Sequence, residues 1–187
     1  MQNAHSKTYP MILCALFTTL IIIGTFIKVP IPFVPFTLQF LFTTLAGILL
    51  GPKLGSISVL VYILLGLIGI PVFTEGGGLS YIFKPTFGYI IGFLVGTYIT
   101  GKIARAVPNP SFKRLLGASF TGLFIVYLFG LIYFYLIKNF YLGTNISLWS
   151  LFLYCFILAV PGDMLLCFIS SLLGQKLIPL LNKKSLQ

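Results

Sequence analysis

The chain has 187 residues, of which 58% are hydrophobic and 7% are charged, and its mean hydropathy is +1.08. Soluble globular domains of this length do not carry so much apolar surface, whereas runs of about 20 apolar residues are typical of transmembrane helices. The net charge of +10 does not indicate binding to nucleic acid, because the twelve Lys and Arg residues lie at the ends of apolar segments and form no soluble basic face.

Six apolar segments follow one another along the chain, and we interpret each as a transmembrane helix. They cover about 11–27, 37–50, 54–70, 86–105, 115–137 and 151–178. The second is short for a full span, so we expect it to be tilted, broken or capped by the preceding loop. The sequence therefore predicts an all-α integral membrane protein. It forms a single domain over residues 1–187, a compact bundle of six helices in membrane lipid, with outer loops that cap a ligand cavity.

The positive charges predict how the bundle is oriented in the membrane. With both termini in the cytoplasm, nine Lys and Arg residues lie on the inner side, and the outer side holds only Lys28, Lys84 and Lys138. This distribution follows the positive-inside rule. We therefore expect a multi-pass protein of the bacterial cell (inner) membrane with both termini cytoplasmic. The same orientation brings two loops together on the outer side, VPIPFVPFT (29–37) and TEGGGLSYIFKP (74–85).

Glycines predict two different features. One set repeats every four residues on one face of the fourth segment, where it allows close packing of helices in lipid: Gly88, Gly92 and Gly96. A second set is adjacent in sequence and forms a tight turn with exposed amide groups: Gly76, Gly77 and Gly78. Irregular backbone at membrane depth is tolerated where it is buried in protein or lines a cavity, so the second set predicts a loop over a binding cavity.

Asp163 is the most informative single residue. It lies inside the sixth apolar segment, directly after Pro161 and Gly162, which favour a kink that frees backbone carbonyls. An acid at this depth costs at least about 2.5 kcal/mol unless it is satisfied. Asp163 is therefore either the structural partner of a buried lysine or hydroxyl or, as we favour, a contact for a ligand or ion.

The other candidates for ligand contacts lie in or beside the outer loops: Thr37, Gln39, Ser80, Tyr81, Lys84 and Tyr89. A buried amide such as Gln39 needs hydrogen-bond partners from the protein or from a ligand. Lys84 is either an anchor at the membrane interface or a cation that attracts an anionic ligand. For Glu75, a functional role and a simple solvated loop charge are equally compatible with the sequence.

Several motifs resemble catalytic sites but lack the required context. GTYITGK (96–102) matches most of a phosphate-binding loop, yet Ile103 follows it and the stretch ends a membrane helix. The only histidine is His5, in the predicted cytoplasmic tail, so no nucleophile–base pair and no set of metal ligands is supported. We therefore expect no enzyme activity, no cofactor and no metal, and transport that depends on a partner or runs downhill.

A combination of motifs resembles the BioY family. VPFTLQ, LAGILLGPKLG, GLIGIPVF and KPTFGYIIGF occur in order between residues 34 and 93, and VPGDM follows in the sixth segment. BioY proteins are the biotin-binding S components of energy-coupling factor (ECF) transporters. The resemblance implies biotin bound near the outer face under the first and third loops. It also implies a complex with one membrane T component and two cytoplasmic ATPases, with Ala15 and Thr19 at the matching spacing for contact with the T component.

The chemistry of biotin agrees with this resemblance. Its ureido ring offers two N–H donors to Asp163 and one carbonyl acceptor to Gln39 or to an amide of the glycine turn. The family's lysine three residues after the aspartate is replaced by Leu166, and Lys84 stands where the family has a glycine. Our hypothesis is that Lys84 supplies the missing positive charge. The alternatives are an S component for a different vitamin, or a membrane assembly subunit without a small-molecule ligand.

Overall fold

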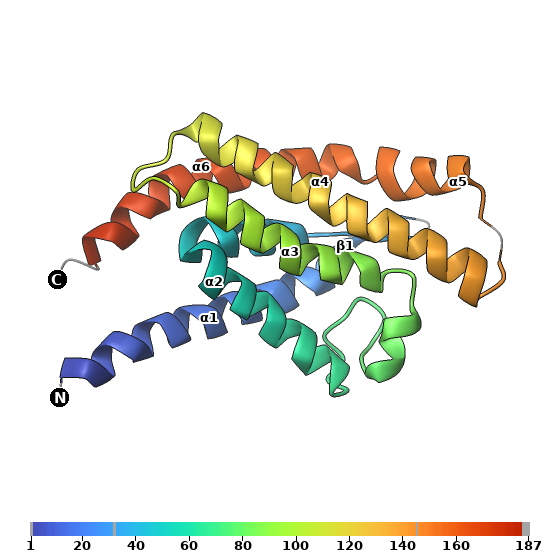
Figure 1. Cartoon of the computed structure of the whole chain (residues 1–187), viewed down its shortest axis with the longest axis horizontal. Helices are drawn as coiled ribbons and strands as arrows, with labels where there is room; N and C mark the ends of the chain where they lie inside the picture. Colours follow the sequence, from blue (N-terminus) through green and yellow to red (C-terminus); the bar gives the residue numbers. More distant parts are fainter. Residues whose placement is uncertain (1, 32, 145, 185–187) are drawn as a thin grey trace.

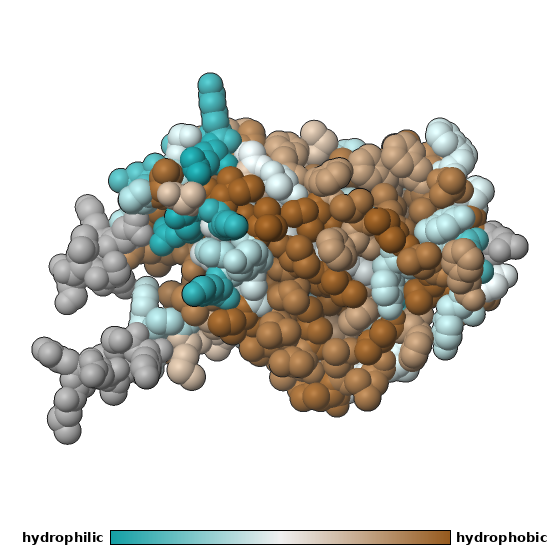
Figure 2. Space-filling model, viewed as in Figure 1, coloured by the Kyte–Doolittle hydropathy of each residue, from teal (hydrophilic) through white to brown (hydrophobic). Residues whose placement is uncertain are grey.

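The computed structural model describes the backbone of residues 2–31, 33–144 and 146–184. The long helices are α1 (Gln2–Phe26), α2 (Gln39–Leu67), α3 (Phe87–Ala104), α4 (Phe112–Leu136) and α6 (Val160–Lys184) (Figure 1). Within these described residues, five stretches are long and apolar enough to cross a membrane: Thr8–Phe26, Gln39–Leu67, Phe87–Ala104, Phe112–Tyr141 and Leu148–Leu181. The predicted all-α class is therefore confirmed. Figure 2 shows that apolar residues cover the middle of the molecule, whereas hydrophilic residues gather toward its two ends.

Helix α2 reverses direction at Gly51. This residue has φ 82° and ψ −177°, a conformation that glycine adopts readily, and Pro52 follows it. In a continuous helix Ala46 and Gly55 would be separated by about 13.5 Å along the axis. Instead, a methyl group placed on Gly55 would lie 2.7 Å from the carbonyl oxygen of Ala46. The two limbs of α2 therefore contact each other beside the turn, and the expected segments 37–50 and 54–70 fall on these limbs.

Helix α3 packs between α2 and α4 (Figure 1). On one side, a methyl group on Gly92 would lie 2.8 Å from the Cα of Val126 in α4. On the other side, a methyl group on Gly101 would lie 2.7 Å from the carbonyl carbon of Gly51. The backbone of α3 thus touches both neighbours without intervening side chains, and the close packing predicted from the glycine ladder is confirmed.

Two loops lie at the end of the bundle opposite the termini, which we call the loop end (Figure 1). In the α1–α2 loop, β1 (Lys28–Val29) pairs with β2 (Phe36–Thr37) in an antiparallel ladder that places Lys28 opposite Thr37. Between these strands Phe33 has φ 71° and packs edge-on against Phe134 and Tyr154. The α2–α3 loop contains the 3-10 helix η1 (Leu79–Phe83).

The last span is not a uniform α-helix, in contrast to the single helix expected over 151–178. The short α5 (Leu148–Phe152) continues into a π-helical turn, η3 (Leu153–Ile157), before α6 begins. A similar π-helical turn, η2 (Ile137–Tyr141), follows α4. The amide of Asp163 donates to the carbonyl of Ala159, so the α-helical pattern resumes just at the acid. Single π-helical turns are frequent at functional sites.

Candidate ligand-binding site

A pocket lies at the loop end of the bundle, and both loops and four helices contribute to its lining. Its apolar wall includes Phe36, Phe40, Ile90, Phe93, Val126 and Ala159. Its polar side chains are Thr37, Gln39, Tyr62, Thr74, Tyr81, Thr86, Tyr89, Tyr127 and Asp163. Mostly apolar pockets with a few convergent polar groups are typical sites for small molecules.

Asp163 reaches the pocket from the first turn of α6 and is 8% exposed. The hydroxyl of Tyr127, on α4, donates a hydrogen bond of 2.5 Å to its Oδ2 atom. The hydroxyl partner weighed as a structural alternative is thus present, and the same carboxylate also lines the pocket. A carboxylate accepts up to about four hydrogen bonds, so Asp163 retains capacity for ligand donors.

Gln39 and Tyr62 place unsatisfied polar atoms in the same pocket. Gln39 is the first residue of α2 and is 3% exposed, and Tyr62, on the second limb of α2, is 0% exposed. Among the described residues, neither Gln39 Nε2 nor the hydroxyl of Tyr62 makes a hydrogen bond of standard geometry, although the side chains of Thr25 and Gln39 lie near that hydroxyl. Leaving a buried polar atom unpaired costs about 1–3 kcal/mol. A ligand that pairs these atoms would recover that free energy.

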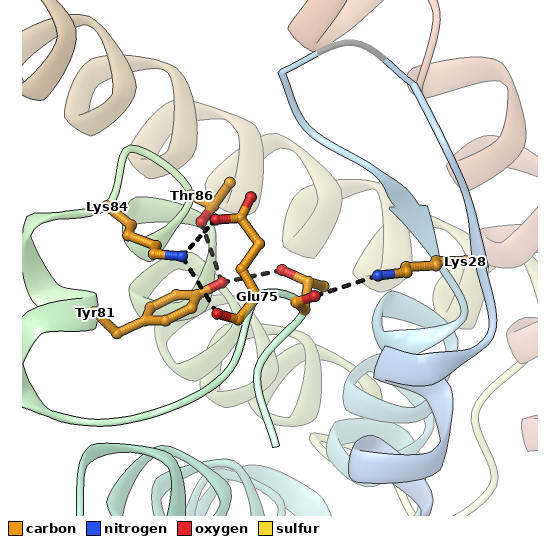
Figure 3. A network of polar contacts seen from close by, with 6 residues as sticks. Lys28, Glu75, Tyr81, Lys84 and Thr86 are labelled. Atoms are coloured by element: carbon orange, nitrogen blue, oxygen red, sulfur yellow. Dashed lines mark hydrogen bonds and ion pairs between the residues drawn. The ribbon is translucent and has the colours of Figure 1, made fainter. Parts of the chain in front are cut away.

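Three hydroxyl groups form a row at the side of the pocket that the α2–α3 loop covers. Thr74 Oγ1 lies 3.0 Å from the hydroxyl oxygen of Tyr81, which lies 3.3 Å from Thr86 Oγ1. We call Thr74, Tyr81 and Thr86 the hydroxyl row. Lys28 Nζ donates to the backbone carbonyl of Thr74 at 3.3 Å and so links the two loops (Figure 3).

The structure divides the residues predicted from the sequence into two groups. The pocket brings together Thr37, Gln39, Tyr81, Tyr89 and Asp163. The described lining does not include Gly76, Gly77, Gly78, Ser80 and Lys84. The amides of Gly76 and Gly78 donate to the carbonyls of Phe73 and Gly66, so the loop itself uses them. A ligand contact by this second group stays a prediction.

Lys84 forms an ion pair with Glu75, with 2.7 Å between Nζ and Oε2 (Figure 3). The loop charge of Glu75 therefore has a specific partner. On α1, Ala15 and Thr19 are both exposed, and the Thr19 hydroxyl donates to the Ala15 carbonyl at 3.0 Å.

Sequence reasoning missed four polar residues of the pocket: Tyr62, Thr74, Thr86 and Tyr127. Tyr62 and Tyr127 lie in the middle of apolar segments, where nothing in the sequence distinguishes them from the other aromatic residues of those segments. Thr74 is the first residue of the loop stretch 74–85, and Thr86 directly follows that stretch. Their position at the two ends of one polar loop was the available signal.

Comparison with known proteins places the chain in a family. The model of the BioY family matches residues 1–183. A probable biotin transporter BioY from Lysinibacillus sphaericus is 42% identical over 92% of this chain and 88% of its own length. The biotin transporter BioY from Thermotoga maritima is 39% identical over 70% of this chain and 75% of its own length.

A solved structure shows the same fold. The crystal structure of the S component for biotin from an ECF-type ABC transporter superposes with a TM-score of 0.79, at 30% identity and with 92% of each chain covered. Family model, relatives and fold agree, and the chain therefore belongs to the BioY family.

Proposed function

We propose that this chain is the biotin-binding S component of an ECF-type ABC transporter and has no enzyme activity of its own. Relatives that cover most of the chain are biotin transporters, and the similar solved structure is an S component for biotin. The observation that carries the proposal is the chemistry of the pocket. It presents a buried acceptor, Asp163, together with two unpaired polar groups on Gln39 and Tyr62.

The ureido ring of biotin has the complementary pattern, with two N–H donors and one carbonyl acceptor. In the proposed pose Asp163 accepts from an N–H group, while Gln39 Nε2 and the Tyr62 hydroxyl donate to the carbonyl. Charge-assisted hydrogen bonds of the first kind are about twice as strong as neutral ones. The ring system and the aliphatic side chain then pack against aromatic residues such as Phe40 and Phe93.

The proposal also covers the topology. The first limb of α2, residues 39–50, is about 18 Å long and does not span a hydrocarbon core of about 30 Å by itself. We infer that the α1–α2 loop completes this span and caps the pocket. Counting the two limbs separately gives six spans, with the loop end outside and both termini in the cytoplasm of a bacterial cell.

Uptake requires partners in this proposal. The sequence carries no usable ATP-binding motif, so the energy comes from two cytoplasmic ATPases through a T component in the membrane. The exposed pair Ala15 and Thr19 offers a small-residue face on α1 where another helix can approach closely. We propose this face as the contact with the T component.

The test is binding of labelled biotin to the purified chain in detergent, with excess unlabelled riboflavin or thiamine as competitors. We expect tight binding that unlabelled biotin displaces and the other two vitamins do not. A Thr121→Ala variant, altered at an exposed hydroxyl of α4 outside the described lining, serves as a control and should bind as the wild type does. Displacement by riboflavin or thiamine would show an S component for another vitamin. Absence of labelled-biotin binding would contradict the proposal.

A further inference from the structure

The loop end carries three lysines, Lys28, Lys84 and Lys138, and their surroundings differ. Lys84 is neutralised by Glu75 at 2.7 Å. Lys138 Nζ lies 5.9 Å from the centre of the Phe33 ring, in a cation–π arrangement. Lys28 donates to a neutral backbone carbonyl, that of Thr74. Among the described residues, Lys28 has no carboxylate within ion-pair distance, so its charge is uncompensated.

Lys28 lies beside the pocket. The β1–β2 ladder places it directly opposite Thr37, and its ammonium group contacts Thr74. Both threonines line the pocket, one from each loop. Lys28 itself is exposed, so the ammonium group stands at the rim between the two loops (Figure 3). Lys84, in contrast, is not part of the described lining, and its ammonium group lies over the Tyr81 ring, 5.2 Å from its centre.

The charges of the pocket favour one orientation for an anionic ligand. Asp163 is the only charged side chain of the described lining, and it is negative. A ligand carboxylate is therefore repelled from the position of Asp163 and attracted toward Lys28. The hydroxyl row begins at Thr74, next to Lys28, and can supply neutral donors to the same carboxylate.

We propose that Lys28, with the hydroxyl row, binds the side-chain carboxylate of biotin at the mouth of the pocket. Lys28 thereby sets a preference for free biotin over derivatives whose carboxylate is amidated. This inference rests on the proposed function and assigns the charge that Lys84 was expected to supply. It follows that the ring system is recognised deep in the pocket by Asp163, while the charged tail is recognised at the rim.

The experiment compares dissociation constants for biotin and for biotinamide, which has the same ring system and an uncharged tail. We expect the wild type to bind biotin about five-fold more tightly, the upper end of what an exposed ion pair contributes. Lys28→Met should bring the ratio to about one and leave the affinity for biotinamide unchanged. Lys28→Glu should invert the ratio. Raising the salt concentration from about 0.01 M to 1 M should lower the wild-type ratio toward one.

Lys84→Met is the matched control, because it removes a lysine from the same end of the molecule, and it should keep the wild-type ratio. A ratio that survives Lys28→Met, or that disappears with Lys84→Met, would overturn the assignment to Lys28 while leaving biotin as the ligand. If the wild type bound neither compound, the proposed function would fail, and this inference with it.

Discussion

Replacing Asp163 by Asn tests the proposed pose at its most constrained point. The hydroxyl of Tyr127 has one proton, which it donates to Oδ2 of Asp163 at 2.5 Å. Among the described residues, this is the one hydrogen bond that the Tyr127 hydroxyl makes. In Asp163→Asn the amide carbonyl should therefore turn to Tyr127, and the NH₂ group should face the pocket. A donor would then meet the N–H of the biotin ring.

The magnitude follows from two losses. A hydrogen bond to a charged group contributes about 1.5–3 kcal/mol, and leaving a buried donor unpaired costs about 1–3 kcal/mol. Because part of the first term overlaps with the second, we expect a total of about 3 kcal/mol. At 1.4 kcal/mol for each factor of ten, biotin should bind about 100-fold more weakly.

A second substitution separates this explanation from a simple loss of charge. In the double variant Asp163→Asn, Tyr127→Phe, the amide is free to turn its carbonyl toward the ligand, so about five-fold of the affinity should return. Tyr133→Phe is the matched control, because Tyr133 also lies on α4 but donates to the Ile82 carbonyl outside the described lining. Affinities would be measured by calorimetry in detergent. Equal affinities with and without Tyr127→Phe in the Asn background would refute the reasoning.

Three further outcomes are expected. Tyr62→Phe removes a buried hydroxyl that makes no hydrogen bond of standard geometry with the described residues, so the Tm without biotin should rise while biotin affinity falls about five-fold; a lower Tm would show that the hydroxyl is satisfied. Gly101→Ala places a methyl group 2.7 Å from the backbone of Gly51 and should lower stability by about 1–3 kcal/mol, whereas Gly117→Ala, with no atom within 4 Å, should keep or raise the Tm. Ala15→Phe should keep biotin affinity and reduce co-purification with the T component, and unchanged co-purification would exclude this face of α1 as the contact.

The sequence predicted features that stand out against an apolar background. Asp163 is conspicuous because an acid inside an apolar segment demands a partner. The adjacent glycines likewise marked a loop beside the site. The expected segments end at residue 50 and begin again at residue 54, and the structure places the reversal between them at Gly51, since glycine tolerates the required positive φ.

Features that depend on helix rotation could not be predicted. A helix that is apolar on all sides has no polar face to show which residues point inward, so Tyr62 and Tyr127 were not distinguished from other aromatics. The position of Lys28 depends on a two-residue ladder across a proline-rich loop, which leaves no clear strand pattern. Lys84 appeared free because its partner, Glu75, lies nine residues earlier and reaches it only through the folded loop.

The backbone contacts of α3 also bear on how such a protein can change during evolution. At Gly92 and Gly101 even one added carbon atom would meet a neighbouring backbone at 2.8 Å or less, so these positions are closed to substitution. Substitutions can accumulate at positions whose side chains touch no neighbouring backbone, above all in the two loops and at the start of α6. A lineage that acquires a new ligand should therefore rewrite the loop end and inherit the interior of the helical frame unchanged.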